Sequence, residues 1–478
     1  MEKARGRILS VASECVPLLK TGGLADVVGA LPGALAAEGW EMRVLMPCYR
    51  ALRWRLDGMA EVFAEDDLFG GRGRVLAGEI AGRQMLLLDA PHLYDREGGP
   101  YTGPEGDWGD NAQRFAALSW IAARIAREGL ADGWRPQILH AHDWQAGFAP
   151  AYLAYGGANG VRSVLTVHNI AFQGWAPAAL LGVLRLPAAE YHPGALEYYG
   201  GLSALKAGLV TADHITTVSP TYACELMRPE FGMGLQGVIA ARAAHVTGIL
   251  NGVDTDVWSP GAEERPYSVT DLTQKAANRS VLEGAFKLHV PGPLAILVSR
   301  LTYQKGIDLI PEVLPDFIEA GGGLAVLGTG DAPLEAAMRA LELRFPGRVG
   351  VRIGYDEGLS HLMFAGGDAV LVPSRFEPCG LTQMYGLRYG TIPVVALTGG
   401  LADTIINANP AALAAGCATG LTFHPAEPPP FAEALRRLLH LHADPVAWAH
   451  VQRNAMTHPV GWETSAAAYA GLYRELLA

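Results

Sequence analysis

The sequence predicts an α/β fold with two doubly wound parallel-sheet domains. In both halves of the chain, continuous apolar strand segments alternate with segments of helical spacing. The chain has 478 residues, which is too long for one ordinary hydrophobic core. The alternation weakens over residues 255–293 and then restarts, so this stretch is interpreted as the domain crossing.

The expected strands are runs of apolar and β-branched residues. In the first half they are 7–14, 41–47, 84–91, 136–143, 161–169 and 214–220, and in the second half 294–300, 323–330, 349–355, 368–374 and 392–397. The clearest helical spacing is found in 24–39, 111–130 and 461–478. Continuous apolar strands separated by helices indicate a parallel sheet that is covered on both faces.

Both halves contain the same hexapeptide, TGGLAD, at Thr21–Asp26 and Thr398–Asp403. Each copy is expected to be a loop that leads into a helix. A lysine also precedes a glycine after the first strand of each half, at Lys20 and Lys305. Ligands bind at the carboxyl ends of the strands in open α/β sheets. The sequence therefore predicts an anion-binding cleft formed by the loops of both domains.

The stretch PSRFEPCGLTQ, beginning at residue 373, combines an expected anion site with a carboxylate. A helix that begins near Gly380, Leu381 and Thr382 offers unpaired N–H groups and the positive end of a helix dipole. By itself this is also an ordinary strand-to-helix turn. The nearby motif SRLTYQKG adds Arg300 and Lys305, whose guanidinium and ammonium groups suit phosphate oxygens. The position of Glu377 beside an anion site needs a separate explanation.

Several protein classes lose support from the sequence. The net charge is −11 with dispersed basic residues, which disfavours nucleic acid as a partner. There is no P-loop and no dinucleotide fingerprint, and no apolar run is long enough for a membrane helix. Five scattered cysteines and the absence of a recognisable targeting segment at the N-terminus favour a protein of the reducing cytoplasm.

Histidine and cysteine residues at strand ends allow both structural and chemical interpretations. His140, His142 and Asp143 are close in sequence, but no third ligand has a diagnostic spacing, so no metal is expected. His168 lies at another strand end, where histidine is usually packed and hydrogen bonded but also suits sugar hydroxyls. Cys379 lies where a thiol could be acidified, but no histidine relay is evident beside it, so a nucleophile is disfavoured.

Eight motifs span nearly the whole chain: KTGGLADVVGALP, HAHDWQAG, TVHNIAFQG, TTVSPTYA, GILNGVD, SRLTYQKG, PSRFEPCGLTQMYGLRYGTIPVV and TGGLADT. Taken together and in this order, they resemble the motifs of bacterial glycogen synthases and the related plant starch synthases. The resemblance implies a GT-B fold, with two Rossmann-like domains that face each other across a deep cleft. It places the first domain at 1–250, the second at 251–455, and a helix that crosses back to the first domain at 456–478.

The resemblance also implies a reaction and its substrates. Glucose moves from ADP-glucose to the non-reducing 4-hydroxyl of an α-1,4-glucan such as glycogen or a maltooligosaccharide, with retention at the anomeric carbon and release of ADP. No cofactor and no metal are implied. A bacterial, cytoplasmic enzyme is expected, whereas the oligomeric state is not indicated.

The family's functional residues can be carried over to matching positions of this sequence. Phosphate contacts are implied for Lys20, Arg300, Lys305, Gly380, Leu381 and Thr382, and stacking on adenine for Tyr355. Contacts to the donor sugar or acceptor glucan are implied for Gly22, Asp26, Tyr94, Asp143, Trp144, His168, Asn169, Asn251 and Cys379. Catalytic roles are implied for Glu377, Arg300, Lys305 and His168.

The implied role of Glu377 is not that of a nucleophile. The resemblance implies that this carboxylate contacts hydroxyls of the donor ring, while the acceptor attacks from the side of the departing phosphate. Position 385 is Tyr, as glycogen synthases tend to have, where many related transferases have a Glu that contacts the ribose. The alternatives are a catalytically silent nucleotide-sugar or glucan-binding protein of the same fold and, with less support, an epimerase or phosphorylase.

Overall fold

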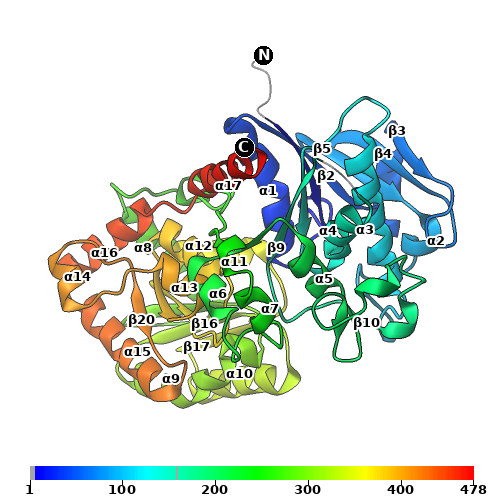
Figure 1. Ribbon diagram of the computed structural model, residues 1–478. Coiled ribbons are helices and arrows are strands. Elements are labelled where there is room, and N and C mark those ends of the chain that lie inside the picture. The colour runs from blue at the N-terminus through cyan, green and yellow to red at the C-terminus, as the bar shows by residue number, and fades with distance from the viewer. Residues whose placement is uncertain (1–5, 158–159) are drawn as a thin grey trace. The chain divides into compact units, whose positions relative to one another are not determined.

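The protein forms two compact units in the computed structural model, which describes residues 6–157 and 160–478 (Figure 1). The first unit contains the chain up to Leu250 together with Trp462–Ala478, and the second contains Asn251–Gly461. Residues 1–5 lie outside the described residues. They are part of the expected first domain and of the N-terminal stretch in which no targeting segment is expected.

A mixed sheet of nine strands forms the centre of the first unit. Its order is β14 (Val246–Gly248), β13 (His214–Thr217), β9 (Arg162–Val167), β8 (Ile138–His142), β1 (Gly6–Val11), β2 (Trp40–Pro47), β5 (Arg83–Asp89), β4 (Gly73–Ile80) and β3 (Ala60–Glu65). The pairings from β14 to β5 are parallel, and those of β5 with β4 and β4 with β3 are antiparallel. In this register Ile8 lies between Met42 and Ile138.

Helices cover this sheet, and short strands extend its loops. The helices are α1 (Gly23–Ala37), α2 (Pro91–Tyr94), α3 (Asn111–Glu128), α4 (Phe148–Tyr155), α5 (Ala204–Thr211), α6 (Pro220–Glu225), α7 (Gln236–Ala240) and α17 (Trp462–Leu477). The short strands are β6 (Thr102–Gly103), β7 (Gly106–Asp107), β10 (Trp175–Pro177), β11 (Glu197–Tyr198) and β12 (Gly201–Ser203).

The last helix of the chain, α17, completes the hydrophobic core of the first unit. Its buried Tyr469 and Tyr473 pack in one cluster with Ile8 and Trp40. The Tyr473 hydroxyl lies 2.8 Å from Nδ1 of the buried His140. Figure 1 shows α17 beside α1. Since burial of one large apolar side chain contributes about 1.5–3 kcal/mol, this helix is an integral part of the first core.

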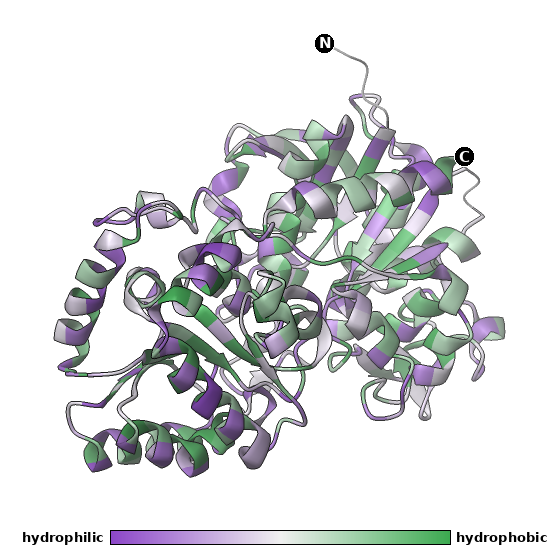
Figure 2. Cartoon of the chain, turned by 90° about the vertical axis from the view of Figure 1, so that its left-hand side faces the viewer, coloured by the Kyte–Doolittle hydropathy of each residue, from purple (hydrophilic) through white to green (hydrophobic). Residues whose placement is uncertain are grey.

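A parallel sheet of six strands forms the centre of the second unit. Its order is β17 (Val349–Ile353), β16 (Gly323–Gly328), β15 (Leu294–Val298), β18 (Ala369–Val372), β19 (Ile392–Ala396) and β20 (Leu421–Phe423). The helices are α8 (Thr273–Phe286), α9 (Ile310–Glu319), α10 (Ala332–Arg344), α11 (Glu357–Gly366), α12 (Thr382–Tyr389), α13 (Gly399–Thr404), α14 (Pro410–Ala414), α15 (Pro428–His442) and α16 (Pro445–Thr457). Figure 2 shows mainly hydrophobic residues along the central strands of this sheet, as expected for strands buried on both faces.

All eleven expected strands are confirmed, with ends that coincide or are shifted by up to three residues. The interpretation of 255–293 as a domain crossing is wrong, because this stretch contains α8 and belongs to the second unit. The buried Lys275 of α8 donates to the carbonyls of Phe364 and Ala365 and to the Thr391 hydroxyl. Residues 456–461 also belong to the second unit, because α16 continues through Thr457.

No helix in the part of the chain that the structure describes combines the length and apolar character needed to cross a membrane.

Candidate functional site

The predicted site residues follow the carboxyl ends of parallel strands in each unit. In the second unit, β15 leads to Arg300 and Lys305, and its neighbour β18 leads to Glu377. In the first unit, the adjacent strands β1, β8 and β9 lead to the Lys20, Asp143 and His168 loops. The topology therefore gathers these side chains at one edge of each sheet.

An ion pair between Lys305 and Glu377 forms the centre of the second-unit site. Nζ of Lys305 lies 2.5 Å from Oε2 of Glu377, and the buried Ser374 hydroxyl donates to the same oxygen at 2.8 Å. The Glu377 side chain is only 9% exposed. Both charged residues line a small pocket together with Thr382. The carboxylate is thus held at a defined position by two donors.

The anion site expected after Glu377 has the predicted backbone form. Gly380 adopts a left-handed φ of 74°, which glycine allows without strain, and α12 then begins at Thr382. No side chain caps this helix start, and its first N–H groups have no intrahelical acceptors. The positive end of the α12 dipole therefore lies a few residues from the Lys305–Glu377 pair.

Arg375 joins the loop of Lys305 to the loop of Glu377. Its guanidinium donates to both carboxylate oxygens of Asp308 at 2.7 Å and to the carbonyl of Tyr303 at 2.9 Å. The Arg375 backbone N–H donates to the carbonyl of Gln304, whose side chain donates to the carbonyl of Phe376. These bonds fix the position of the Lys305 loop relative to the Glu377 loop. They therefore hold both residues of the ion pair in place.

The other predicted residues of the second unit differ in accessibility. Tyr355 follows β17, is 78% exposed and donates to Glu357. Arg300 is also exposed, whereas Asn251 and Cys379 are buried. Burial raises the pKa of the Cys379 thiol to about 12, so this thiol is protonated near neutral pH. This agrees with the expectation that Cys379 is not a nucleophile.

Glu14 organises the predicted phosphate loop of the first unit. Its buried carboxylate accepts from the backbone N–H of Thr21 at 2.5 Å and from the Thr21 hydroxyl at 2.8 Å. Tyr101 also donates to it at 2.9 Å. Lys20 is half exposed, with Nζ 2.8 Å from the Asp26 carboxylate. Gly22 follows in extended backbone at the start of α1.

Three buried histidines connect the centre of the first sheet to this edge. His142 lies between Ser10, at 3.1 Å from its Nε2, and His168, whose Nε2 is 3.0 Å from its Nδ1. The His140 ring lies 4.3 Å from the His142 ring at a tilt of 34° and is hydrogen bonded to Thr166. Burial lowers the pKa of His140 and of His168 to about 3 and that of His142 well below its ordinary value. All three rings are therefore neutral near pH 7.

Asp143 acts on the backbone of the His168 loop. Its Oδ1 accepts from the N–H of His168 at 2.7 Å and from the N–H of Asn169 at 3.3 Å. Asp143 has a left-handed φ of 54°, which is uncommon for a non-glycine residue and is concentrated at functional sites. Burial raises its pKa to about 7. The next residue, Trp144, packs edge to face on Phe115 at 4.9 Å.

The implied glucan contact of Tyr94 is wrong for its side chain. Tyr94 is only 1% exposed, and its hydroxyl donates to the carbonyl of Arg114 at 2.6 Å. The buried hydroxyl needs this acceptor, so the ring is directed into the core instead of toward a ligand.

Across the described stretches of the chain, no group of three His, Cys, Asp or Glu residues could hold a metal ion.

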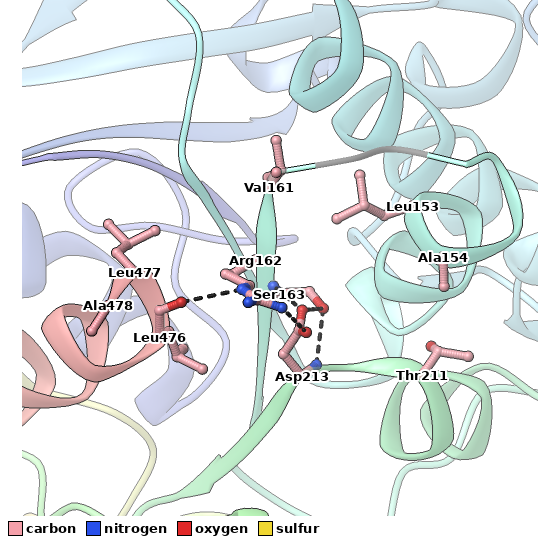
Figure 3. Close-up of a pocket in the computed structure, with 11 residues that line it drawn as sticks. Leu153, Ala154, Val161, Arg162, Ser163, Thr211, Asp213, Leu476, Leu477 and Ala478 are labelled. Atoms are coloured by element: carbon pink, nitrogen blue, oxygen red, sulfur yellow. Dashed lines mark hydrogen bonds and ion pairs between the residues drawn. The ribbon is translucent and has the colours of Figure 1, made fainter.

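One pocket of the first unit lies away from this edge of the sheet (Figure 3). It is lined by Arg162 and Ser163 at the amino end of β9, by Asp213, and by the end of α17. Arg162 pairs with Asp213 at 3.2 Å and donates to the Leu476 carbonyl. This pocket therefore lies at the amino end of β9, whereas His168 follows the carboxyl end of the same strand.

Sequence reasoning missed the residues that hold the site in place. The sequence patterns selected none of Glu14, Ser374 and Arg375 as a site residue. Ser374 and Arg375 lie within the motif that begins at residue 373, and Glu14 lies at the end of the first expected strand. Arg375 pairs with Asp308 and Glu14 accepts from Tyr101, and both of these partners are far away in sequence. A polar residue directly after a buried strand was the available signal.

Comparisons with known proteins agree with this architecture. The family model described as starch synthase catalytic domain matches residues 7–241, and the model of glycosyl transferases group 1 matches residues 284–454. Over 478 residues, the chain is 87% identical to the glycogen synthase of Cereibacter sphaeroides, with all of both chains covered. It is 57% identical to that of Paracoccus denitrificans, covering 99% of this chain and 100% of the relative.

A solved structure shows the same fold. The catalytic domain of starch synthase IV from Arabidopsis thaliana, bound to ADP and acarbose, is 30% identical, has a TM-score of 0.86 and is covered over 99% of each chain. The Rossmann-like units and the matched family models define a glycosyltransferase with the GT-B fold. Within that class, the chain belongs to the bacterial glycogen synthase family and is a glucosyltransferase of glycogen synthesis.

The neutral histidines predict a loss of stability in acid. Their folded pKa values lie below the ordinary value of about 6.5, so the unfolded state binds more protons as pH falls from about 6.5 toward 3. Each histidine then removes about 1.4 kcal/mol per pH unit from the free energy of unfolding. In urea unfolding between pH 7 and 5, His140→Gln should show a shallower pH dependence than the wild type.

Thr216→Val is the matched control. Its hydroxyl lies 2.6 Å from the Thr166 hydroxyl in the same buried network but does not titrate. It should lower the free energy of unfolding by the same amount at both pH values. An unchanged pH slope in His140→Gln would show that the ring is already protonated in the folded protein or does not contribute.

Proposed function

We propose that the enzyme transfers glucose from ADP-glucose to the non-reducing 4-hydroxyl of an α-1,4-glucan, with retention at the anomeric carbon. The observation that carries this proposal is the Lys305–Glu377 pair beside the start of α12. A cation and a helix N-terminus suit a departing diphosphate, and the adjacent carboxylate suits a sugar that acquires positive charge. The related starch synthase IV domain has ADP and acarbose bound, which supports a nucleotide-sugar donor and a glucan acceptor.

In this proposal, the phosphate groups of the donor are bound by cationic side chains from the loops and by backbone N–H groups. Lys305 and Arg300 contact the diphosphate together with the N–H groups at Gly380–Thr382, and Lys20 adds a further cation. These groups stabilise the negative charge that develops on ADP as the glycosidic bond breaks. The high exposure of Tyr355 supports its proposed stacking on adenine. No metal or other cofactor is part of the proposed mechanism.

The proposed sugar contacts depend on groups held by buried partners. We assign donor-sugar contacts to His168, Asn169 and Asn251. Gly22 lies two residues after Lys20 and Cys379 lies next to Gly380, so both are beside proposed phosphate contacts. In the described chain, Oδ1 of Asn251 is buried without a hydrogen-bond partner, which supports a ligand contact. Burial keeps His168 neutral, so its ring can share a hydrogen bond with a hydroxyl.

Acceptor contacts are proposed for Asp26 and Trp144, and for Asp143 through the loop that it holds. Glu377 orients the donor ring and stabilises positive charge near the anomeric carbon, and the acceptor hydroxyl attacks on the face from which ADP leaves. We also propose a cytoplasmic location, which is supported by five cysteines that all remain free thiols.

Donor competition tests the proposed substrate. With glycogen as acceptor, purified protein should release ADP from ADP-glucose and prefer this donor over UDP-glucose. Glucose incorporation and nucleotide release are measured together for each donor. Tight binding of ADP-glucose without turnover would favour the silent binding protein, and formation of glucose 1-phosphate from glycogen and phosphate would favour a phosphorylase.

Removal of the Glu377 carboxylate tests the proposed catalytic role. Glu377→Ala should lower kcat by about 100-fold or more, because transition-state charge stabilisation of this kind contributes that much in other enzymes. ADP binding should be retained, and the protein should still fold, with a lower thermal unfolding temperature because Lys305 and Ser374 lose their partner. The control is Glu312→Ala on α9, which removes a carboxylate of the same unit outside the site. Turnover near the wild-type rate in Glu377→Ala would remove this residue from the proposed mechanism.

Replacement of Lys305 tests the leaving-group contact. Lys305→Ala should weaken ADP binding and lower kcat/KM for the donor by about 10- to 100-fold, since hydrogen bonds to charged groups contribute about 1.5–3 kcal/mol. ADP affinity is measured by calorimetry and transfer by steady-state kinetics. Lys287→Ala, which removes an exposed lysine after α8, should leave both values unchanged. Unaltered ADP affinity and rate in Lys305→Ala would contradict the assignment.

A further inference from the structure

The two copies of TGGLAD have different surroundings although their sequences are identical. Both lead into a helix, since α1 begins at Gly23 and α13 begins at Gly399. In the first copy, a Cβ added to Gly22 or Gly23 would meet no atom within 4 Å. Those glycines are open, as expected for a loop that admits a ligand. The second copy is packed against protein.

The second copy lies directly against the loop that carries Glu377. A Cβ on Gly399 would overlap the carbonyl oxygen of Glu377, and a Cβ on Gly400 would overlap the carbonyl oxygen of Cys379. The Gly400 N–H lies 3.1 Å from the carbonyl oxygens of both Glu377 and Pro378. Gly399 has a left-handed φ of 44°. The loop and the start of α13 can approach this closely only because neither glycine has a side chain.

The two copies are also followed by different residues, Val27 after the first and Thr404 after the second. The buried Thr404 hydroxyl donates to the Gly400 carbonyl at 2.6 Å. It also accepts from Nε2 of Gln383 at 3.2 Å. A chain of hydrogen bonds thus connects the start of α13 to the first turn of α12.

Gln383 extends this chain to the anion loop. Its side chain is fully buried, and Nε2 lies 3.0 Å from the Cys379 carbonyl and 2.9 Å from the Gly380 carbonyl. The backbone after Glu377 is therefore contacted by two N–H groups, one from Gly400 and one from Gln383. Thr404 links the segments that supply these donors.

We propose that the second TGGLADT segment is a positioning element for the carboxylate of Glu377, with Gly400 and Thr404 as its positioning residues. The proposal rests on the catalytic role proposed for Glu377. The segment contacts the backbone beside that carboxylate, whereas Lys305 and Ser374 hold its Oε2. A backbone shift of about 1 Å at such a loop can lower a rate about 100-fold without removing any reacting group.

The mildest test exchanges Thr404 for the residue type found in the first copy. Thr404→Val keeps the shape of the side chain but removes the hydroxyl, and should lower kcat by about tenfold or more. Thr404→Ser restores the hydroxyl and should recover most of the wild-type kcat. Equal kcat values for Thr404→Val and the wild type, with both proteins folded, would overturn the proposal. Loss of kcat in Thr404→Val without recovery in Thr404→Ser would also contradict it.

A steric test uses Gly400→Ala and a control with a similar backbone contact. In Gly366→Ala, the new Cβ would lie 2.7 Å from the Asn278 carbonyl oxygen, in the same unit but between α11 and α8. Both variants should unfold at lower temperature than the wild type. Only Gly400→Ala should also lose kcat, by about 100-fold. Comparable kcat losses in the two variants would reduce the effect to stability and contradict a positioning role.

A double-mutant cycle separates this inference from the proposed role of Glu377. If Thr404 acts through Glu377, Thr404→Val should cause little further loss of kcat in a Glu377→Ala background. Multiplying losses would show that Thr404 acts independently and would overturn the inference while leaving the role of Glu377 intact. Wild-type turnover in Glu377→Ala alone would instead refute the proposed function of that residue, and the inference with it.

Discussion

The common direction of the parallel strands is the constraint on which the site residues of each unit depend. Because β15 and β18 are adjacent and parallel, the loops that follow them meet, and Lys305 reaches Glu377 across 2.5 Å. The same rule brings together the loops after β1, β8 and β9, where Glu14, Asp143 and His168 lie. Residues that are far apart in sequence become neighbours through strand order, and short polar contacts then set their positions.

Much of the fold could be predicted because the central strands are buried on both faces and appear as continuous apolar runs. The parts that were missed have weaker patterns. The antiparallel β3 and β4 are partly exposed and mix charged with apolar residues. Residues 255–293 look like a linker because α8 buries Lys275, whose ammonium group donates to Tyr267, to carbonyls of α11 and to the residue before β19.

The chemistry of the site was easier to predict than its support. Local motifs were enough to select Lys305, Glu377 and the glycine that precedes α12. Contacts such as Arg375 with Asp308, or Thr404 with Gln383, link residues that are many positions apart, and no local spacing specifies them. Tyr94 illustrates the opposite error, because a motif position says nothing about which acceptor a buried hydroxyl will find.

The return of the chain to the first unit through α17 has a consequence for biosynthesis. Tyr469 and Tyr473 belong to a core whose members outside α17 are all synthesised before Leu250. At the usual speed of translation, that core remains without its last wall for on the order of ten seconds or more, while all of the second unit is made. The unit that emerges first from the ribosome is therefore the last to be completed, and its uncovered apolar surface is the part of the nascent chain that most needs protection.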